Sequence, residues 1–178
     1  MSEISTSRTG QPSRWSTLHV FLHWAVVAFI IVQWWTGHDV GRLLHAEERG
    51  RTVDTSEAVL AYTHVAFGVL VLLSMLTRLY DRYSHGRPPH PQDVPNWAHW
   101  LAKATHLLLY AVLIVMPLTG LAAFFGGIEP AEEVHETLWT VLLVLIVLHI
   151  VGAFVNHFHY KNDVLLRMMP WHQRRAET

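Results

Sequence analysis

Long apolar runs alternate with short polar segments along the whole 178-residue chain. A helix that crosses the hydrocarbon core of a bilayer needs about 20 mainly apolar residues. Four runs have about this length, and the polar connections leave no room for a separate soluble domain. We therefore predict an all-α integral membrane protein, a bundle of four transmembrane helices. The predicted spans are Leu18–Trp35, Ala58–Leu79, Leu107–Phe125 and Leu138–Phe158.

The same pattern divides the chain into an N-terminal tail, residues 1–17, a transmembrane domain, residues 18–160, and a C-terminal tail, residues 161–178. The first seventeen residues lack an apolar core, and no small-residue cleavage site follows the first span, so we expect this span to be retained. A Pro-rich segment, Pro88–Pro95, leads into a predicted short interfacial helix, Asn96–Thr105.

The lysines and arginines are distributed unevenly between the two sides of the predicted bundle. Ten of the 13 belong to the termini, the second connection and its flanks, and three to the first and third connections. The positive-inside rule therefore places both termini in the cytoplasm. The opposite side is acidic, since the third connection carries Glu129, Glu132, Glu133 and Glu136. The formal net charge is only −1, so no general attraction to nucleic acid is expected.

Cysteine is absent from the chain, whereas histidine occurs 14 times. The lack of thiols excludes a cysteine-ligated iron–sulfur cluster, a thiolate zinc site and the covalent attachment of a c-type haem. Any metal must be held by histidine or carboxylate. Ionisable residues at membrane depth are costly and usually face the interior of a bundle. The histidines that fall within the predicted spans are therefore the candidate ligands.

Four histidines form two pairs at two depths. His135 and His149 are fourteen residues apart on the fourth span, so they lie about 21 Å apart and on one face of a helix. His64 matches the depth of His135, and His23 approaches that of His149. We call His23 and His149 the inner pair, and His64 and His135 the outer pair.

Two histidines at one depth on different helices suit the iron of a haem with two axial imidazoles. A zinc ion would require three or four ligands that converge on one point. For any single histidine the alternative is a hydrogen-bonded interior residue. The joint pattern of depth, face and number favours two haems.

Three further residues fit this interpretation. Gly68 lies one turn from His64, and Gly152 lies three residues from His149, so a flat macrocycle has room to approach the backbone; close helix packing also explains them. Arg78 follows His64 by fourteen residues and therefore lies at the depth of the inner pair. It is placed to bind the propionates of an inner haem, or else to anchor the helix at the membrane surface.

The remaining histidines are weaker candidates. We expect His19 to lie at the level of the lipid headgroups and His106 to be the substitute if one inner ligand is wrong. His157, His159 and Lys161 end the fourth span and are predicted to bind and protonate a quinone, with a solvated interface as the alternative. We assign no role to His38, His45, His85, His90, His99 and His172.

Several of these motifs together resemble the bacterial cytochrome b561 family, from about Trp15 to Pro170. They are His-Trp at 23–24, Thr-His-Val-Ala-Phe-Gly at 63–68, Val-His-Glu-Thr at 134–137, Leu-His at 148–149 and Leu-Leu-Arg-Met-Met-Pro at 165–170. That family includes superoxide oxidase and is related to the cytochrome b subunits of hydrogenases and formate dehydrogenases. The resemblance implies two non-covalent b haems, with the inner and the outer pair as axial ligands. It also implies exchange of electrons with the ubiquinone pool.

Three hypotheses for the function follow. The first is a superoxide:ubiquinone oxidoreductase of the bacterial inner membrane, in which superoxide gives up its electron and quinone is reduced to quinol. The second is a carrier or anchor subunit that passes electrons from a periplasmic dehydrogenase to quinone. The third is a histidine-rich metal transporter without haem.

Overall fold

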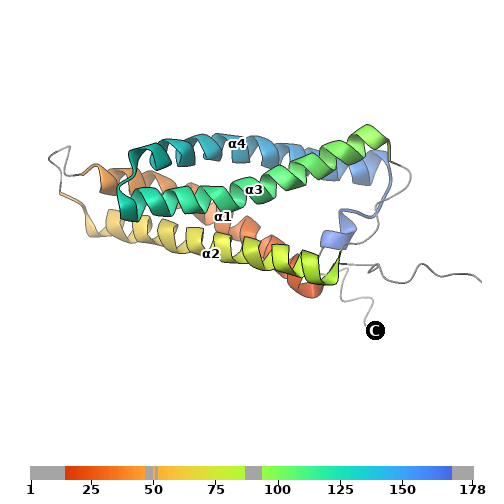
Figure 1. Ribbon diagram of the computed structural model, residues 1–178, viewed down its shortest axis with the longest axis horizontal. Coiled ribbons are helices and arrows are strands. Elements are labelled where there is room, and N and C mark those ends of the chain that lie inside the picture. The colour runs from red at the N-terminus through yellow and green to blue at the C-terminus, as the bar shows by residue number, and fades with distance from the viewer. Residues whose placement is uncertain (1–14, 47–49, 51, 87–93, 170–178) are drawn as a thin grey trace, which may run out of the picture.

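Four long helices lie side by side in the computed structural model, which describes residues 15–46, 50, 52–86 and 94–169 (Figure 1). They are α1 (Thr17–Leu44), α2 (Thr55–His85), α3 (Asn96–Gly126) and α4 (Glu129–Phe154). A π-helical turn, η1 (Val155–His159), extends α4, and a 3-10 turn, η2 (Leu166–Met168), follows. Each of the four helices is long and apolar enough to cross a membrane. The predicted four-span all-α membrane bundle is therefore confirmed.

The helices extend beyond the apolar runs from which they were predicted. α1 continues past Trp35 to Leu44, and α2 begins at Thr55 because Asp54 forms a capping box with Glu57. The predicted separate helix over Asn96–Thr105 is wrong, because this segment is the first part of α3. No glycine or proline separates it from the third span, so nothing in the sequence interrupts the helix.

A tight connection joins α3 to α4. Gly127 adopts a left-handed conformation with φ of 59°, and its amide donates to the carbonyl of Ala123 at 3.0 Å. This is a glycine C-cap, a conformation that costs a residue with a side chain more. α4 then starts within two residues, with proline in its first turn. The two helices are thereby held antiparallel, and the register of α4 against α3 is fixed.

The bundle consists of two helical hairpins. α1 packs along α2, α3 packs along α4, and α2 also contacts α3 (Figure 1). Within the described residues, the backbones of α1 and α4 make few close approaches. A small apolar core fills the middle of the bundle, and it consists of Val26, Val71, Met75, Val112, Leu113, Leu142 and Leu145. The candidate ligands lie on either side of this core, one pair toward each end of the bundle.

We name the two ends of the bundle after their charges. The basic end contains the start of α1, the end of α2, the start of α3 and the end of α4. The acidic end contains the other four helix ends, and the glutamates that were predicted in the third connection lie there at the start of α4. Large apolar side chains cover the outer surface between the ends, such as Phe21, Trp35 and Phe125, which are 67%, 76% and 72% exposed. Such an apolar surface is favourable in contact with lipid chains and unfavourable in contact with water.

The segment that follows α4 turns back onto the bundle. The indole N–H of Trp24 donates to the carbonyl of Met168 at 2.8 Å, and the side-chain amide of Asn162 donates to Asn156 at 2.9 Å. Lys161 makes the reversal possible with a φ of 50°. The first part of the predicted C-terminal tail is therefore folded against α1 at the basic end.

Candidate functional site

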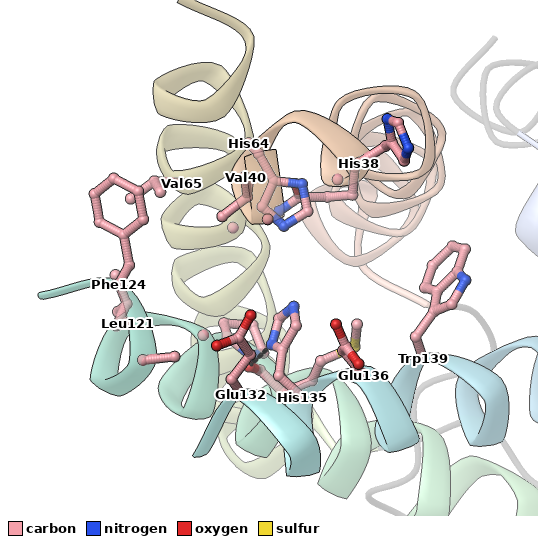
Figure 2. A pocket seen from close by; sticks show the side chains of 18 of the residues that line it. His38, Val40, His64, Val65, Leu121, Phe124, Glu132, His135, Glu136 and Trp139 are labelled. Atoms are coloured by element: carbon pink, nitrogen blue, oxygen red, sulfur yellow. Dashed lines mark hydrogen bonds between the residues drawn. The ribbon is translucent and has the colours of Figure 1, made fainter. Parts of the chain in front are cut away.

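The outer pair faces a large cavity at the acidic end. His64 projects from α2 and His135 from α4, and their ring centroids are 6.2 Å apart. Figure 2 shows the two imidazoles pointing toward one another across the cavity from opposite walls. The cavity has a volume of about 740 Å³, within the range of sites that hold cofactors. It is lined mainly by apolar residues of all four helices, including Leu113, Leu121, Phe124 and Trp139.

Hydrogen bonds fix which nitrogen of each outer imidazole carries the proton. Nδ1 of His135 lies 2.8 Å from the carbonyl of Met116, which can only accept, so Nδ1 is the donor. Nδ1 of His64 lies 3.3 Å from the hydroxyl of Thr36, whose own proton goes to the carbonyl of Val32. His64 therefore also donates from Nδ1. In both rings Nε2 keeps a free lone pair, the arrangement found in histidines that bind a metal.

The separation within the outer pair also fits an ion held between the rings. When an imidazole nitrogen binds a metal at about 2 Å from each side, the two nitrogens lie about 4 Å apart. Each ring centroid lies about 1 Å behind its nitrogen, so the two centroids are then about 6 Å apart. The observed 6.2 Å leaves room for one ion between the rings without any movement of α2 or α4.

Two glycines that the sequence analysis did not select give the outer imidazoles their space. A Cβ atom at Gly120 would lie 2.8 Å from Cε1 and 2.9 Å from Nδ1 of His135. A Cβ atom at Gly37 would lie 3.3 Å from Cε1 of His64. Gly68, which was selected, lies in the cavity wall but would instead meet the side-chain amide of Gln33 at 2.9 Å.

The inner pair comes together at the basic end. The centroids of His23, from α1, and His149, from α4, are 6.1 Å apart. His106 of α3 is close by, with its ring 5.0 Å from that of His149 and its Nδ1 donating to the carbonyl of Ala102 at 2.6 Å. A Cβ atom at Gly152 would meet nothing within 4 Å, so no neighbouring side chain occupies the space next to this glycine. In the described part of the chain no three potential ligands converge as a zinc site requires.

Arg78 lies beside the inner pair and is buried, with 8% of its surface exposed. Its guanidinium lies over the ring of Tyr110, 5.8 Å from the centroid, and Nη2 lies 3.3 Å from Nε2 of His19. Nε of Arg78 is buried and has no hydrogen-bond partner. An unpaired, buried donor of this kind suits the carboxylate of a haem propionate.

His19, which was expected at the level of the lipid headgroups, has its partners within the bundle. Its side chain is almost completely buried between α1 and α2, with 1% exposed, because Asp81 and Arg78 hold it there. The position along the helix indicated the depth of His19, but it could not reveal two charged partners on the neighbouring helix.

A single spacing connects the two ends on every helix. Each helix carries one residue of the basic end and one of the acidic end, fourteen residues apart: His23 and Gly37, His64 and Arg78, His106 and Gly120, His135 and His149. Fourteen residues bring a helix back to nearly the same face about 21 Å farther on. The spacing that selected Arg78 and His149 would also have selected Gly37 and Gly120.

The candidate quinone residues lie just beyond the inner pair. His157 is half-buried in the π-helical turn η1, and its Nδ1 is buried without a hydrogen-bond partner. π-Helical turns occur frequently at functional sites. His159 and Lys161 are exposed, and the His159 ring contacts the neighbouring Tyr160. Of the three, His157 alone therefore offers a buried polar atom to a ligand.

The acidic end is rich in ion pairs. Nη1 of Arg42 lies 3.6 Å from carboxylate oxygens of both Asp39 and Glu57, and Nε2 of His45 lies 3.1 Å from Glu132. Two other arginines of this side, Arg49 and Arg51, lie outside the described residues. The positive charge of Arg42 is thus already balanced by carboxylates.

Comparison with known proteins identifies the family. A sequence profile of the prokaryotic cytochrome b561 family matches residues 14–171, almost the whole chain. The chain belongs to the prokaryotic cytochrome b561 family. The predicted resemblance is therefore confirmed, and with it a b-type haem as cofactor and a role in electron transfer. Membership in this family favours haem over the metal-transporter hypothesis.

Relatives of this cytochrome b561 come from several bacteria. Cytochrome b561 homolog 1 of Escherichia coli is 26% identical over 89% of this chain and 98% of its own. A probable superoxide oxidase, CybB, of Yersinia pestis is 25% identical over 88% and 96%. Cytochrome b562 of Cereibacter sphaeroides is 28% identical over 89% and 97%. The similarity extends over nearly the full length in each case.

Proposed function

We propose that this cytochrome b561 holds two b haems and exchanges electrons between superoxide and ubiquinone across the bundle. His64 and His135 would hold the iron of the outer haem, and His23 and His149 would hold that of the inner haem. The observation that carries the proposal is the outer pair, in which two imidazoles face each other at 6.2 Å with both Nε2 lone pairs free. The inner pair has nearly the same separation, 6.1 Å.

Bis-histidine ligation determines the type of chemistry. A haem held in this way accepts and releases one electron at a time without an open coordination position. Substrates therefore react by electron transfer from outside the iron, and this chain contributes the position and the surroundings of each site. In the proposed overall reaction two superoxide anions are oxidised to dioxygen, while one quinone takes up two electrons and two protons to give quinol.

We assign the quinone to the basic end. The unpartnered Nδ1 of His157 is available to hydrogen-bond a quinone carbonyl, and an imidazole can both donate and accept a proton. His159 is the last residue of the same turn, and Lys161 follows it; both are exposed. We infer from the positive-inside rule that this end faces the cytoplasm of a bacterial cell, with the bundle in the inner membrane.

Reduction by superoxide tests the proposed function directly. We expect purified protein to contain two haems per chain in a pyridine haemochrome assay. The oxidised protein should be reduced within the mixing time by superoxide and reoxidised by a short-chain ubiquinone. Superoxide dismutase, added beforehand, is the control that should abolish the reduction. A spectrum that superoxide leaves unchanged would contradict the superoxide assignment while leaving the haem sites standing.

The quinone site can be tested at His157. Replacing it with leucine removes the buried nitrogen, and we expect reoxidation of the reduced protein by quinone to slow at least tenfold, since one buried hydrogen bond to a ligand is worth about 1.4 kcal/mol. His159→Leu is the matched control, because His159 lies two residues away and is exposed. Equal rates in the two variants would move the quinone site elsewhere.

The acidic end favours a second candidate function. Its surface carries the exposed carboxylates of Glu129, Glu133 and Glu136, and Arg42 is paired. A surface of this sign repels a small anion and attracts a basic protein. A subunit that accepts electrons from a basic periplasmic dehydrogenase would suit it. Co-purification of such a partner in mild detergent, together with no reaction with superoxide, would favour this function.

A further inference from the structure

A chain of buried polar groups connects α2 to α1 at the basic end. Oδ2 of Asp81 lies 3.2 Å from Nδ1 of His19, and Nε2 of the same imidazole lies 3.3 Å from Nη2 of Arg78. The three residues are 4%, 1% and 8% exposed. Asp81 and Arg78 are on the same helix, and His19 reaches between them from the other. We call these residues the Asp81–His19–Arg78 relay.

The direction of each hydrogen bond in the relay follows from Arg78. A guanidinium can only donate, so Nε2 of His19 must accept from it. The proton of the neutral imidazole is therefore on Nδ1, from which it is donated to the carboxylate of Asp81. His19 thus links a negative to a positive group and fixes the distance between them. Both ring nitrogens are used, so His19 has none left for a metal.

Other side chains hold the relay in one geometry. The hydroxyl of Ser16 lies 2.9 Å and 3.0 Å from the two carboxylate oxygens of Asp81, and Nδ1 of His85 lies 3.1 Å from Oδ1. The indole of Trp15 stacks on His19 at 4.3 Å between centroids. A buried carboxylate is stable only when its oxygens are paired in this way. The ring of His19 consequently has little freedom to rotate.

An arginine that only anchors a helix would not need such a relay. It would extend its guanidinium into the headgroups, where water and phosphate satisfy it. Arg78 is instead held inside the bundle against His19, one turn from His23, and against Tyr110, one turn from His106. Its Nε has no partner among the described residues. The relay thus keeps a positive charge and one unpaired donor next to the inner pair.

We propose that Asp81 and His19 are positioning residues that hold the guanidinium of Arg78 against the inner haem and thereby raise the reduction potential of that haem. The inference rests on the proposed two-haem function and assigns a role to two residues outside the ligand set. A fixed positive charge beside the iron favours the reduced state, which carries one positive charge fewer. Arg78 acts on the haem directly, and Asp81 and His19 act through Arg78.

The direction in which Asp81→Asn shifts the potential of the inner haem shows whether Asp81 positions Arg78 or acts only through its own negative charge. If Asp81 acted only as a nearby negative charge, Asp81→Asn would raise the potential of the inner haem. If Asp81 acts by holding Arg78 in place, the same substitution frees the guanidinium to move toward the headgroups and lowers the potential. Asp81→Asn retains the size of the side chain and one acceptor oxygen. Its effect therefore reports the loss of charge and not the loss of volume.

Potentiometric titration of the full-length protein tests the relay. The step that belongs to the inner haem is identified as the one that remains in His135→Ala. We expect Arg78→Gln, Asp81→Asn and His19→Leu each to lower the midpoint of this step, with about a tenfold change in the ratio of reduced to oxidised haem for Arg78→Gln, which corresponds to about 59 mV. The midpoint of the outer haem should not change. His19→Gln retains a donor and an acceptor, so its midpoint should lie close to that of the wild type.

Two further variants complete the test. Arg82→Gln is the matched control, because it removes the same charge one turn farther along α2, where the guanidinium lies over Tyr110 at 5.5 Å. It should shift the midpoint much less than Arg78→Gln. In the double variant of Arg78→Gln and Asp81→Asn, the midpoint should be no lower than in Arg78→Gln alone. Ser16→Ala should give a smaller shift in the same direction, which keeps the test usable if Asp81→Asn does not fold.

A higher or unchanged midpoint in Asp81→Asn and His19→Leu, with a lower midpoint in Arg78→Gln, would overturn the relay alone. A wild-type protein that contains no inner haem would overturn the proposed function, and the relay with it. The two failures are therefore distinguished by the haem content of the wild type.

Discussion

His64→Ala and His135→Ala are each expected to reduce the haem content from two to one per chain. The rings of these residues face each other at 6.2 Å, and each has one nitrogen bonded to the protein and one free. Removal of either ring leaves an iron with a single imidazole in an apolar cavity, which retains a non-covalent haem poorly. The inner pair is made of other residues on α1 and α4, so its haem should remain. Haem per chain and the number of steps in a redox titration measure the outcome.

His38→Ala is the control for this experiment. His38 lines the same cavity, and Figure 2 shows its ring to one side of the gap between His64 and His135. We expect this variant to keep both haems. Two haems per chain in both His64→Ala and His135→Ala would mean that the outer pair is misassigned.

Gly120→Val is expected to have nearly the same effect without any change of a ligand. A Cβ atom at this position would lie 2.8 Å from Cε1 of His135, closer than real Cβ atoms approach a neighbour. The imidazole of His135 cannot turn away easily, because its Nδ1 donates a hydrogen bond to the carbonyl of Met116, which lies on α3 together with Gly120. The substitution should therefore force His135 out of position and release the outer haem. Haem per chain should again fall toward one.

Two comparisons make the test at Gly120 specific. Gly37→Val should weaken the outer haem less, because the clash there is with His64 at 3.3 Å. Ala122→Val adds a branched side chain to the same helix at a position outside the cavity lining, and it should leave both haems in place. If Gly120→Val retained two haems with an unchanged redox titration, the space around His135 would not be needed for ligation.

The sequence was sufficient for the parts of the structure that depend on one helix at a time. Hydropathy located four spans, and the fourteen-residue spacing placed His135 and His149 on one face of α4, because both follow from regular helix geometry. The approach of His23 to His149 and of His64 to His135 was inferred from depth. The observed separations of 6.1 Å and 6.2 Å agree with it.

The parts that depend on two helices were missed. The burial of His19 was not predicted, because nothing in its own segment indicates that Asp81 lies opposite, sixty-two residues later. Gly37 and Gly120 were missed because a glycine carries no chemistry of its own, and its importance comes from the ring that occupies its space. The continuity of α3 was not predicted, because the segment Asn96–Thr105 was assigned to a short interfacial helix separate from the span that begins at Leu107.

The small apolar core between the two pairs would let electrons cross the bundle but not protons. None of the seven side chains that form it carries an exchangeable proton, and they pack from all four helices. Electrons tunnel through such a layer, whereas protons need a chain of polar groups or water to cross it. Protons for a quinone at the basic end must therefore come from the solution at that end. Each turnover would then move electrons toward the basic end without accompanying protons. The reaction would therefore contribute to the electrical potential across the membrane.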